Sequence, residues 1–295
     1  MNFLNNLFYY GVIIPVSRLP FTLLYVLSDF MYYVIYYIVG YRKKVVFRNI
    51  KNSFPDKTSA EHQLMAKKFY RHFCDLALES LKVFSISEKE VHDRMVLKNP
   101  EVIDRYFDQG RSVIIAGGHY NNWELFAVAI DSMVKHRTIA IYKPLTSKFF
   151  DDKMRQTRGK YGLRMISTKM VKQIFESERN NLTATIFGID QSPAITAKCH
   201  WMTFLNQETR VLFGTEKYAK EFNYPVVFAR INKEKRGYYS FEFTGEWSNP
   251  QATANGEITE QITRMLEQDI IDKPEFWLWS HKRWKHARSV STGNP

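Results

Sequence analysis

Short apolar segments alternate with amphipathic segments between residues 112 and 189, and no other feature limits the fold of this chain as strongly. The apolar segments have the length of buried β-strands, and the segments between them have the apolar spacing of helices that bury one face. The expected strands are 112–116, 138–142, 163–166 and 183–189, and the expected helices are 122–134, 147–161 and 171–178. Strands separated by such helices form a largely parallel sheet. The predicted fold class is therefore α/β, with a mostly parallel central sheet flanked by helices.

The rest of the chain adds elements around this sheet. Thr58 and Glu61 have the spacing of a capping box, and apolar residues then recur at helical intervals as far as Leu81. Further elements are expected at 209–222 (a helix), 226–232 with 238–244 (a closing hairpin) and 258–271 (an amphipathic helix). With 295 residues, of which 45% are hydrophobic, the chain is long enough to bury a large core.

The N-terminal segment is apolar and rich in tyrosine, with Arg18 and Asp29 as its only charged residues between positions 7 and 39. A helix that spans a bilayer needs about 20 largely apolar residues, and these two charges, together with a proline at position 20, divide the segment into shorter runs. We expect residues 1–40 to be a helical membrane anchor that spans the membrane or lies on it, followed by a domain at 41–295. Basic residues follow at positions 42–51, so that side is expected to be cytoplasmic. The alternative is a helical hairpin packed on the protein's own core.

Charge and short motifs narrow the classes of function. The formal net charge of +12 favours an anionic partner, which leaves nucleic acid, a membrane surface, a phosphorylated substrate or an acidic protein. No nucleic-acid-binding motif is present, so no nucleic acid partner is expected. The two cysteines and the histidines match no metal-binding spacing, and the chain lacks a nucleophile elbow, a P-loop and a dinucleotide fingerprint. No metal and no cofactor are therefore expected.

The segment from Val113 to Glu124 is the predicted site of chemistry, because ligands of α/β sheets bind where strands end in loops. Four apolar residues lead to a glycine pair, and His119 follows in the loop before a helix. Two residues five positions apart do not share one helix face. With His119 in the loop and Glu124 in the first helical turn, however, the carboxylate can accept a hydrogen bond from one imidazole nitrogen. The other nitrogen then faces the cleft as a general base for a hydroxyl. The alternative is that Asn121 and Glu124 form a capping box and His119 has no catalytic part.

This segment and three further blocks resemble the late acyltransferases of lipid A biosynthesis, the lauroyl and myristoyl transferases, within the acyltransferases that carry a His-x4-Asp/Glu motif. The resemblance covers about residues 42–286. The blocks are Arg42-Lys43-Lys44-Val45 with Asn49 and Phe54-Pro55, His119 to Glu124, Asp190-Gln191, and Trp279 to Lys285. Two positions depart from the family pattern: Lys143 stands where arginine is expected, and Ser192-Pro193 follows Asp190-Gln191.

The resemblance implies transfer of a fatty acyl chain from an acyl carrier protein thioester to a hydroxyl of a lipid A precursor, at the cytoplasmic face of the inner membrane. His119 would be the general base, and Glu124 would orient its imidazole. Lys143 and Arg164 are expected to contact substrate, because they lie at strand edges in a stretch, 135–172, that carries 11 basic and 2 acidic residues. The other expected substrate-binding residues are Asn122, Asp190 and Gln191. Asp190 is favoured as a support for the loop that follows it. The turn amides of residues 117–122, or Lys143, would stabilise the oxyanion.

Two other functions remain open at this point. The first is glycerolipid or aminolipid O-acylation, which would use the same histidine, the same carboxylate and the same anchor. The first and last blocks of the resemblance argue against it. The second is a basic protein that binds a membrane surface without catalysis.

Overall fold

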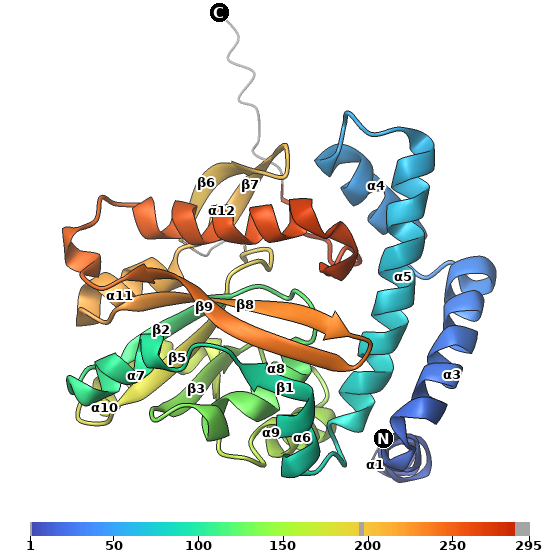
Figure 1. Cartoon of the computed structure of the whole chain (residues 1–295), viewed down its shortest axis with the longest axis horizontal. Coiled ribbons are helices and arrows are strands. Elements are labelled where there is room, and N and C mark those ends of the chain that lie inside the picture. The colour runs from blue at the N-terminus through green and yellow to red at the C-terminus, as the bar shows by residue number, and fades with distance from the viewer. Residues whose placement is uncertain (1, 195–197, 287–295) are drawn as a thin grey trace, which may run out of the picture.

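A seven-stranded sheet forms the centre of the computed structural model, which describes residues 2–194 and 198–286 (Figure 1). Its strands are β1 (Met95–Leu97), β2 (Val113–Gly117), β3 (Arg137–Tyr142), β4 (Arg164–Ser167), β5 (Thr183–Gly188), β8 (Val226–Lys235) and β9 (Tyr238–Trp247). Their order is β1-β9-β8-β2-β5-β3-β4. Only the β8–β9 pair is antiparallel. The predicted α/β fold with a mostly parallel sheet and a closing hairpin is therefore confirmed.

Helices cover both faces of this sheet, which explains why its central strand β2 is apolar at every position. Ile114 and Ala116 of β2 pack in one core with α10, α11 and α12, whereas Val113 and Ile115 pack in a second core with α6, α7 and α8. The helices around the sheet are α4 (Lys43–Ser53), α5 (Ser59–Lys82), α6 (Glu88–Arg94), α7 (Glu101–Asp108), α8 (Trp123–Ala129), α9 (Lys148–Arg158), α10 (Val171–Ser177), α11 (Gly214–Phe222) and α12 (Glu257–Asp272). Short 3₁₀ turns are η3 (Ile130–Met133), η4 (Thr168–Met170), η5 (Pro250–Ala252) and η6 (Pro274–Phe276).

Two local predictions have clear outcomes. The capping box of Thr58 and Glu61 is present and begins α5, as predicted. The helix predicted over 209–222 is wrong at its start, because residues up to Leu212 belong to β7 (Gln207–Leu212). This strand pairs with β6 (Cys199–Phe204) in a separate antiparallel hairpin. Thr209 and Val211 are buried and their neighbours are not, which is the two-residue period of a strand rather than the period of a helix.

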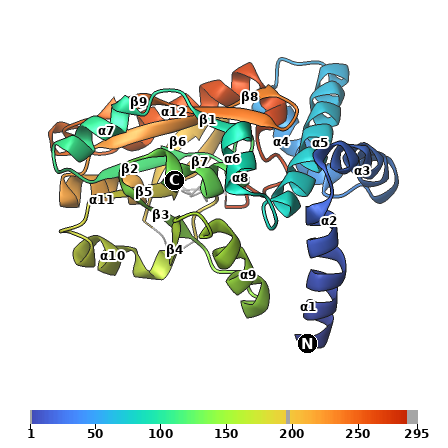
Figure 2. The same ribbon diagram turned by 60° about the horizontal axis from the view of Figure 1, so that its bottom comes forward.

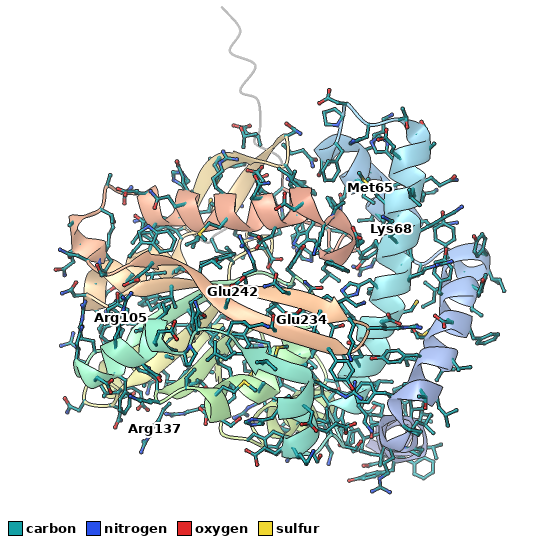
Figure 3. The ribbon with its side chains drawn as sticks, viewed as in Figure 1. Met65, Lys68, Arg105, Arg137, Glu234 and Glu242 are labelled. Carbon is teal, nitrogen blue, oxygen red and sulfur yellow. The ribbon has the colours of Figure 1, made fainter. Side chains whose placement is uncertain are left out.

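The β8–β9 hairpin runs below α12, and its turn points toward the long helix α5 in Figure 1. Strand β1 pairs with β9 and forms the edge of the sheet on this side. The hairpin's outer residues are joined across the two strands, since Nδ2 of Asn232 donates a hydrogen bond of 3.0 Å to Glu242, which is labelled in Figure 3. Figure 3 also shows that α5 carries Met65 and Lys68 along the part of the helix beyond this hairpin. Helix α5 packs against α3 on one side and α8 on the other, so it lies between the N-terminal helices and the sheet.

The N-terminal segment is helical in the part described except at Leu19 and Pro20, which are extended. Its helices are α1 (Asn2–Phe8), η1 (Tyr9–Ile13), α2 (Ile14–Arg18), α3 (Phe21–Tyr33) and η2 (Val34–Val39). From Phe21 to Val39 the helix is long and apolar enough, by length and composition, to cross a membrane. Val26, Phe30 and Ile38 are more than half exposed. This helix could anchor the protein in a membrane, and α1 and α2 extend from the body beside α9 (Figure 2).

One side of α3 is held on the domain by polar contacts. Oγ of Ser28 donates a 2.7 Å hydrogen bond to Asp75 of α5, and Arg236 bridges Asp75 and Asp29. The helix ends at Gly40, which has a positive φ of 65°. The division of the chain into an anchor at 1–40 and a domain at 41–295 stays a prediction.

Candidate active site

His119 lies at the carboxyl end of β2, in the turn that leads to α8, and two glycines allow this turn to pass close to its neighbours. A Cβ atom on Gly118 would lie 2.6 Å from Leu266 of α12, and a Cβ atom on Gly188 of β5 would lie 3.2 Å from Cε1 of His119. Larger residues at either position would require their neighbours to move. The imidazole therefore sits directly against the end of β5.

Asp190, two residues beyond β5, is the carboxylate that orients this imidazole. Its Oδ1 is 2.7 Å from Nδ1 of His119, and its Oδ2 accepts hydrogen bonds of 2.9 Å from the His119 backbone N–H and from Nε1 of Trp277. Asp190 is buried, whereas the His119 side chain keeps 24% of its exposure. A proton on Nδ1 leaves Nε2 as the basic nitrogen on the open side.

The two groups shift each other's pKa in opposite directions. Burial alone would lower the pKa of His119, but the charge and hydrogen bond of Asp190, helped by the charge of Glu124, raise it above its ordinary value. Burial would raise the pKa of Asp190, but His119 and the hydrogen bond from Trp277 hold it well below its usual range. Asp190 therefore stays ionised and stabilises a positive charge on the imidazole.

Glu124 does not form the expected hydrogen bond with His119. Its two oxygens instead accept hydrogen bonds of 2.8 and 2.5 Å from the guanidinium of Arg158, on α9, and one of 3.2 Å from Nε1 of Trp123. The reason is geometric: Glu124 is the second residue of α8 and faces α9, whereas the parallel pairing of β2 with β5 places Asp190 beside the histidine. The catalytic role predicted for Glu124 stays a prediction, but the hydrogen bond through which it was expected to orient the imidazole is not formed.

Asn122 is the N-cap of α8, one residue after the position that the capping-box alternative assumed. Its Oδ1 accepts a 2.8 Å hydrogen bond from the Leu125 amide, and its Nδ2 donates one of 2.7 Å to Glu79. The preceding residue, Asn121, has a positive φ of 54° and donates from its side chain to the Ile231 carbonyl at 2.7 Å. Asn122 is buried, and its side chain caps the helix and bonds to Glu79 instead of facing an open surface where substrate could contact it.

A cavity of about 750 Å³ opens at His119, within the size range of small-molecule sites. Lys143 and Gln191 line it, and Nε2 of Gln191 is 3.2 Å from Nε2 of His119. Most of the other lining residues are apolar, among them Ile115, Phe126, Met154, Leu163, Met165, Ile186, Phe187, Leu212 and Tyr218. Arg164 lies outside the cavity lining, is about half exposed and pairs with Glu178. Of the expected substrate contacts, the structure thus brings Gln191 to His119, places Lys143 in the lining of the same cavity and leaves Arg164 apart.

Within residues 2–194 and 198–286, no three His, Cys, Asp or Glu side chains lie close enough to hold a metal ion.

Comparison with known families identifies the family of this chain. The model of the family described as bacterial lipid A biosynthesis acyltransferase matches residues 3–286, which is nearly the whole chain. The chain belongs to this family. A search of curated proteins finds no match. The resemblance inferred from the sequence blocks is confirmed, and membership implies acyltransferase activity in lipid A biosynthesis, with an acyl donor and a lipid acceptor.

The blocks that carry the family resemblance meet around Asp190 in the folded acyltransferase. Nδ2 of Asn49 donates hydrogen bonds of 2.9 and 3.0 Å to the carbonyls of Trp279 and His281, and Arg42 donates one of 3.0 Å to the carbonyl of Ser280. The backbone N–H of Ser192 donates to Nε2 of His281, whose pKa burial lowers to about 4. The first and last blocks therefore support the segment that holds Asp190 against His119.

Proposed function

We propose that this acyltransferase moves a fatty acyl chain from an acyl carrier protein thioester to a hydroxyl of a lipid A precursor, with His119 as the general base. The observation that carries the proposal is the His119–Asp190 pair at the mouth of a largely apolar cavity. A histidine with one nitrogen held by a carboxylate and the other toward a cavity is suited to deprotonate a bound hydroxyl.

The proposed reaction follows from these contacts. In the free enzyme, Nε2 of His119 accepts from the side-chain amide of Gln191, and the hydroxyl of the acceptor would take that place. As the hydroxyl oxygen attacks the thioester carbonyl, its proton passes to Nε2, and Asp190 stabilises the imidazolium. Collapse of the tetrahedral intermediate breaks the carbon–sulfur bond, and the proton returns from Nε2 to the departing thiolate. The products are an ester and a free thiol, with no covalent acyl-enzyme.

Lys143 is the better supported of the two candidates for the oxyanion. Among the turn amides, that of His119 is bonded to Asp190 and that of Asn121 to the Phe276 carbonyl. Lys143 lines the same cavity as His119, and an ammonium group placed where negative charge develops would lower the barrier to acyl transfer.

Charge and exposure support the proposed donor and location. Lys143, Arg155 and Lys198 line the cavity, and α9 carries further basic residues, so the entrance favours lipid phosphates and an acidic carrier protein. The exposed apolar side of the Phe21–Val39 helix is compatible with attachment to the inner membrane at its cytoplasmic face. The acceptor would then reach the cavity from the membrane.

An assay in vitro tests the substrate assignment. The purified enzyme is offered acyl carrier thioesters of several chain lengths with either a lipid A precursor or lysophosphatidate. We expect a new ester on the lipid A precursor, detected by mass spectrometry, and none on lysophosphatidate. Acylation of lysophosphatidate alone would favour glycerolipid acylation, and no transfer to either acceptor would contradict the proposal.

The pH dependence of this reaction should report on His119. Because only the neutral imidazole accepts a proton, kcat/KM is expected to fall as the pH drops through the pKa of His119, which lies above its ordinary value of 6.5. Asp190→Asn removes the charge that raises this pKa, so the acidic limb should move to lower pH while the maximal rate falls. Rate profiles of both proteins between pH 5 and 9 check this. An unmoved acidic limb in Asp190→Asn would mean that another group controls it.

A further inference from the structure

Glu79 of α5 is a buried carboxylate that joins three elements behind the active site. Its Oε1 accepts a 2.8 Å hydrogen bond from the hydroxyl of Tyr25, on α3. Its Oε2 accepts one of 2.7 Å from Nδ2 of Asn122 and one of 2.8 Å from the hydroxyl of Tyr239, on β9. Glu79 is 3% exposed and does not line the cavity. Burying a carboxylate lowers the stability of the fold unless hydrogen bonds replace its contacts with water. Each of these three hydrogen bonds therefore helps to stabilise Glu79 in its buried position.

The contact with Asn122 reaches the catalytic turn directly. Asn122 follows His119 by three residues, and it fixes the first turn of α8 through the Leu125 amide. Aspartate caps helices as well as asparagine does, so the cap alone does not require an amide at this position. The amide is required by Glu79, to which it donates.

Groups from every neighbouring element act on the charge of Glu79. Burial raises its pKa, the hydrogen bonds from Tyr239 and Tyr25 lower it, the charge of Asp75 raises it and that of Lys233 lowers it, with a net increase. A second carboxylate placed against Glu79 would therefore compete with it for a proton.

We infer that Glu79 is a positioning residue through which helix α3 sets the geometry of the catalytic turn. The inference rests on the acyl transfer proposed above. Helix α3 is part of the apolar helix that could enter a membrane, and its Tyr25 shares Glu79 with the N-cap of α8. The seating of α3 and the rate of acyl transfer are thereby coupled.

Reversal of the amide and carboxylate tests the link. Asn122→Asp keeps the cap acceptor but sets two carboxylates together, and we expect at least a tenfold loss of kcat at pH 8 with little change in KM. Relative to wild type, activity should recover as the pH falls, because a shared proton restores the hydrogen bond. In the double variant Glu79→Gln/Asn122→Asp, the amide is on residue 79 and donates to the carboxylate on residue 122. Its kcat should return to within about threefold of wild type, both at pH 8 and at lower pH.

Two variants test whether α3 affects the rate of acyl transfer through Tyr25. Tyr25→Phe removes one hydroxyl from Glu79, and we expect a three- to tenfold lower kcat. Tyr33→Phe is the matched control on the same helix, where the side chain is 56% exposed, and it should leave kcat unchanged. Equal effects of the two substitutions would overturn the coupling to α3.

Hydrogen exchange separates this inference from the proposed function. Exchange at the first-turn amides of α8, Leu125 above all, should be faster in Asn122→Asp and return to the wild-type rate in the double variant. If wild-type enzyme transfers no acyl chain, the proposed function fails, and exchange still reports on the link. The inference would be overturned if exchange at Leu125 is unchanged in Asn122→Asp. It would also be overturned if the double variant has a kcat no higher than that of Asn122→Asp.

Discussion

His119→Ala is expected to lower kcat/KM for acyl transfer by about 10²–10⁴-fold, the range usual for loss of a positioned general base. This corresponds to about 3–6 kcal/mol of transition-state stabilisation, at about 1.4 kcal/mol for each factor of ten. The loss should appear in kcat, because alanine leaves the apolar cavity able to bind the acyl chain. It is measured by mass spectrometry with the thioester and lipid A precursor.

His200→Ala is the matched control for this variant. His200 also pairs with a carboxylate, since its Nε2 is 2.7 Å from Glu260, and its side chain has 25% exposure against 24% for His119. It does not line the cavity, so its replacement should leave acyl transfer near the wild-type rate. Near-normal turnover by folded His119→Ala protein would remove the chemical basis of the proposed mechanism.

The repeating part of the fold was predictable because each strand and helix there has its own apolar period. The strands from β2 to β5 lie within one or two residues of their predicted bounds. The β6–β7 hairpin was missed because a single residue separates its second strand from α11. A helical window that starts at Thr209 includes the apolar residues of both elements, so the two periods merge.

The candidate site was predictable in position but not in its carboxylate. His119 could be placed at the end of a strand from its glycines and the apolar residues before them. Its partner, Asp190, is 71 residues away in the sequence, and only the adjacency of β2 and β5 brings them together. Strand order does not follow from local periodicity, so the nearer carboxylate, Glu124, was the natural choice. The useful signal was that Asp190 also follows a strand directly, at the same edge of a parallel sheet.

The second large effect is expected at Arg158. The side chains of Arg158 and Glu124 are 21% and 11% exposed, and removing one member of such a pair leaves a buried charge without a partner. Arg158→Met is therefore expected to lower the free energy of unfolding by about 3 kcal/mol, the lower end of the range for broken buried ion pairs. It should also raise the pKa of His119 further, because Arg158 opposes the carboxylates around that imidazole. The acidic limb of the rate profile would then move to higher pH.

Urea unfolding in detergent, followed by tryptophan fluorescence, measures the change in stability against two references. Arg164→Met removes an arginine that is 53% exposed and paired with Glu178, and it should cost less than about 1 kcal/mol. Glu124→Gln/Arg158→Met removes both charges, so it should regain most of the stability lost in Arg158→Met. Because Glu124 raises the pKa of His119 and Arg158 lowers it, the acidic limb should also return toward that of wild type. If Arg158→Met costs no more than Arg164→Met, the pair does not hold α8 against α9, and the predicted loss of stability is wrong.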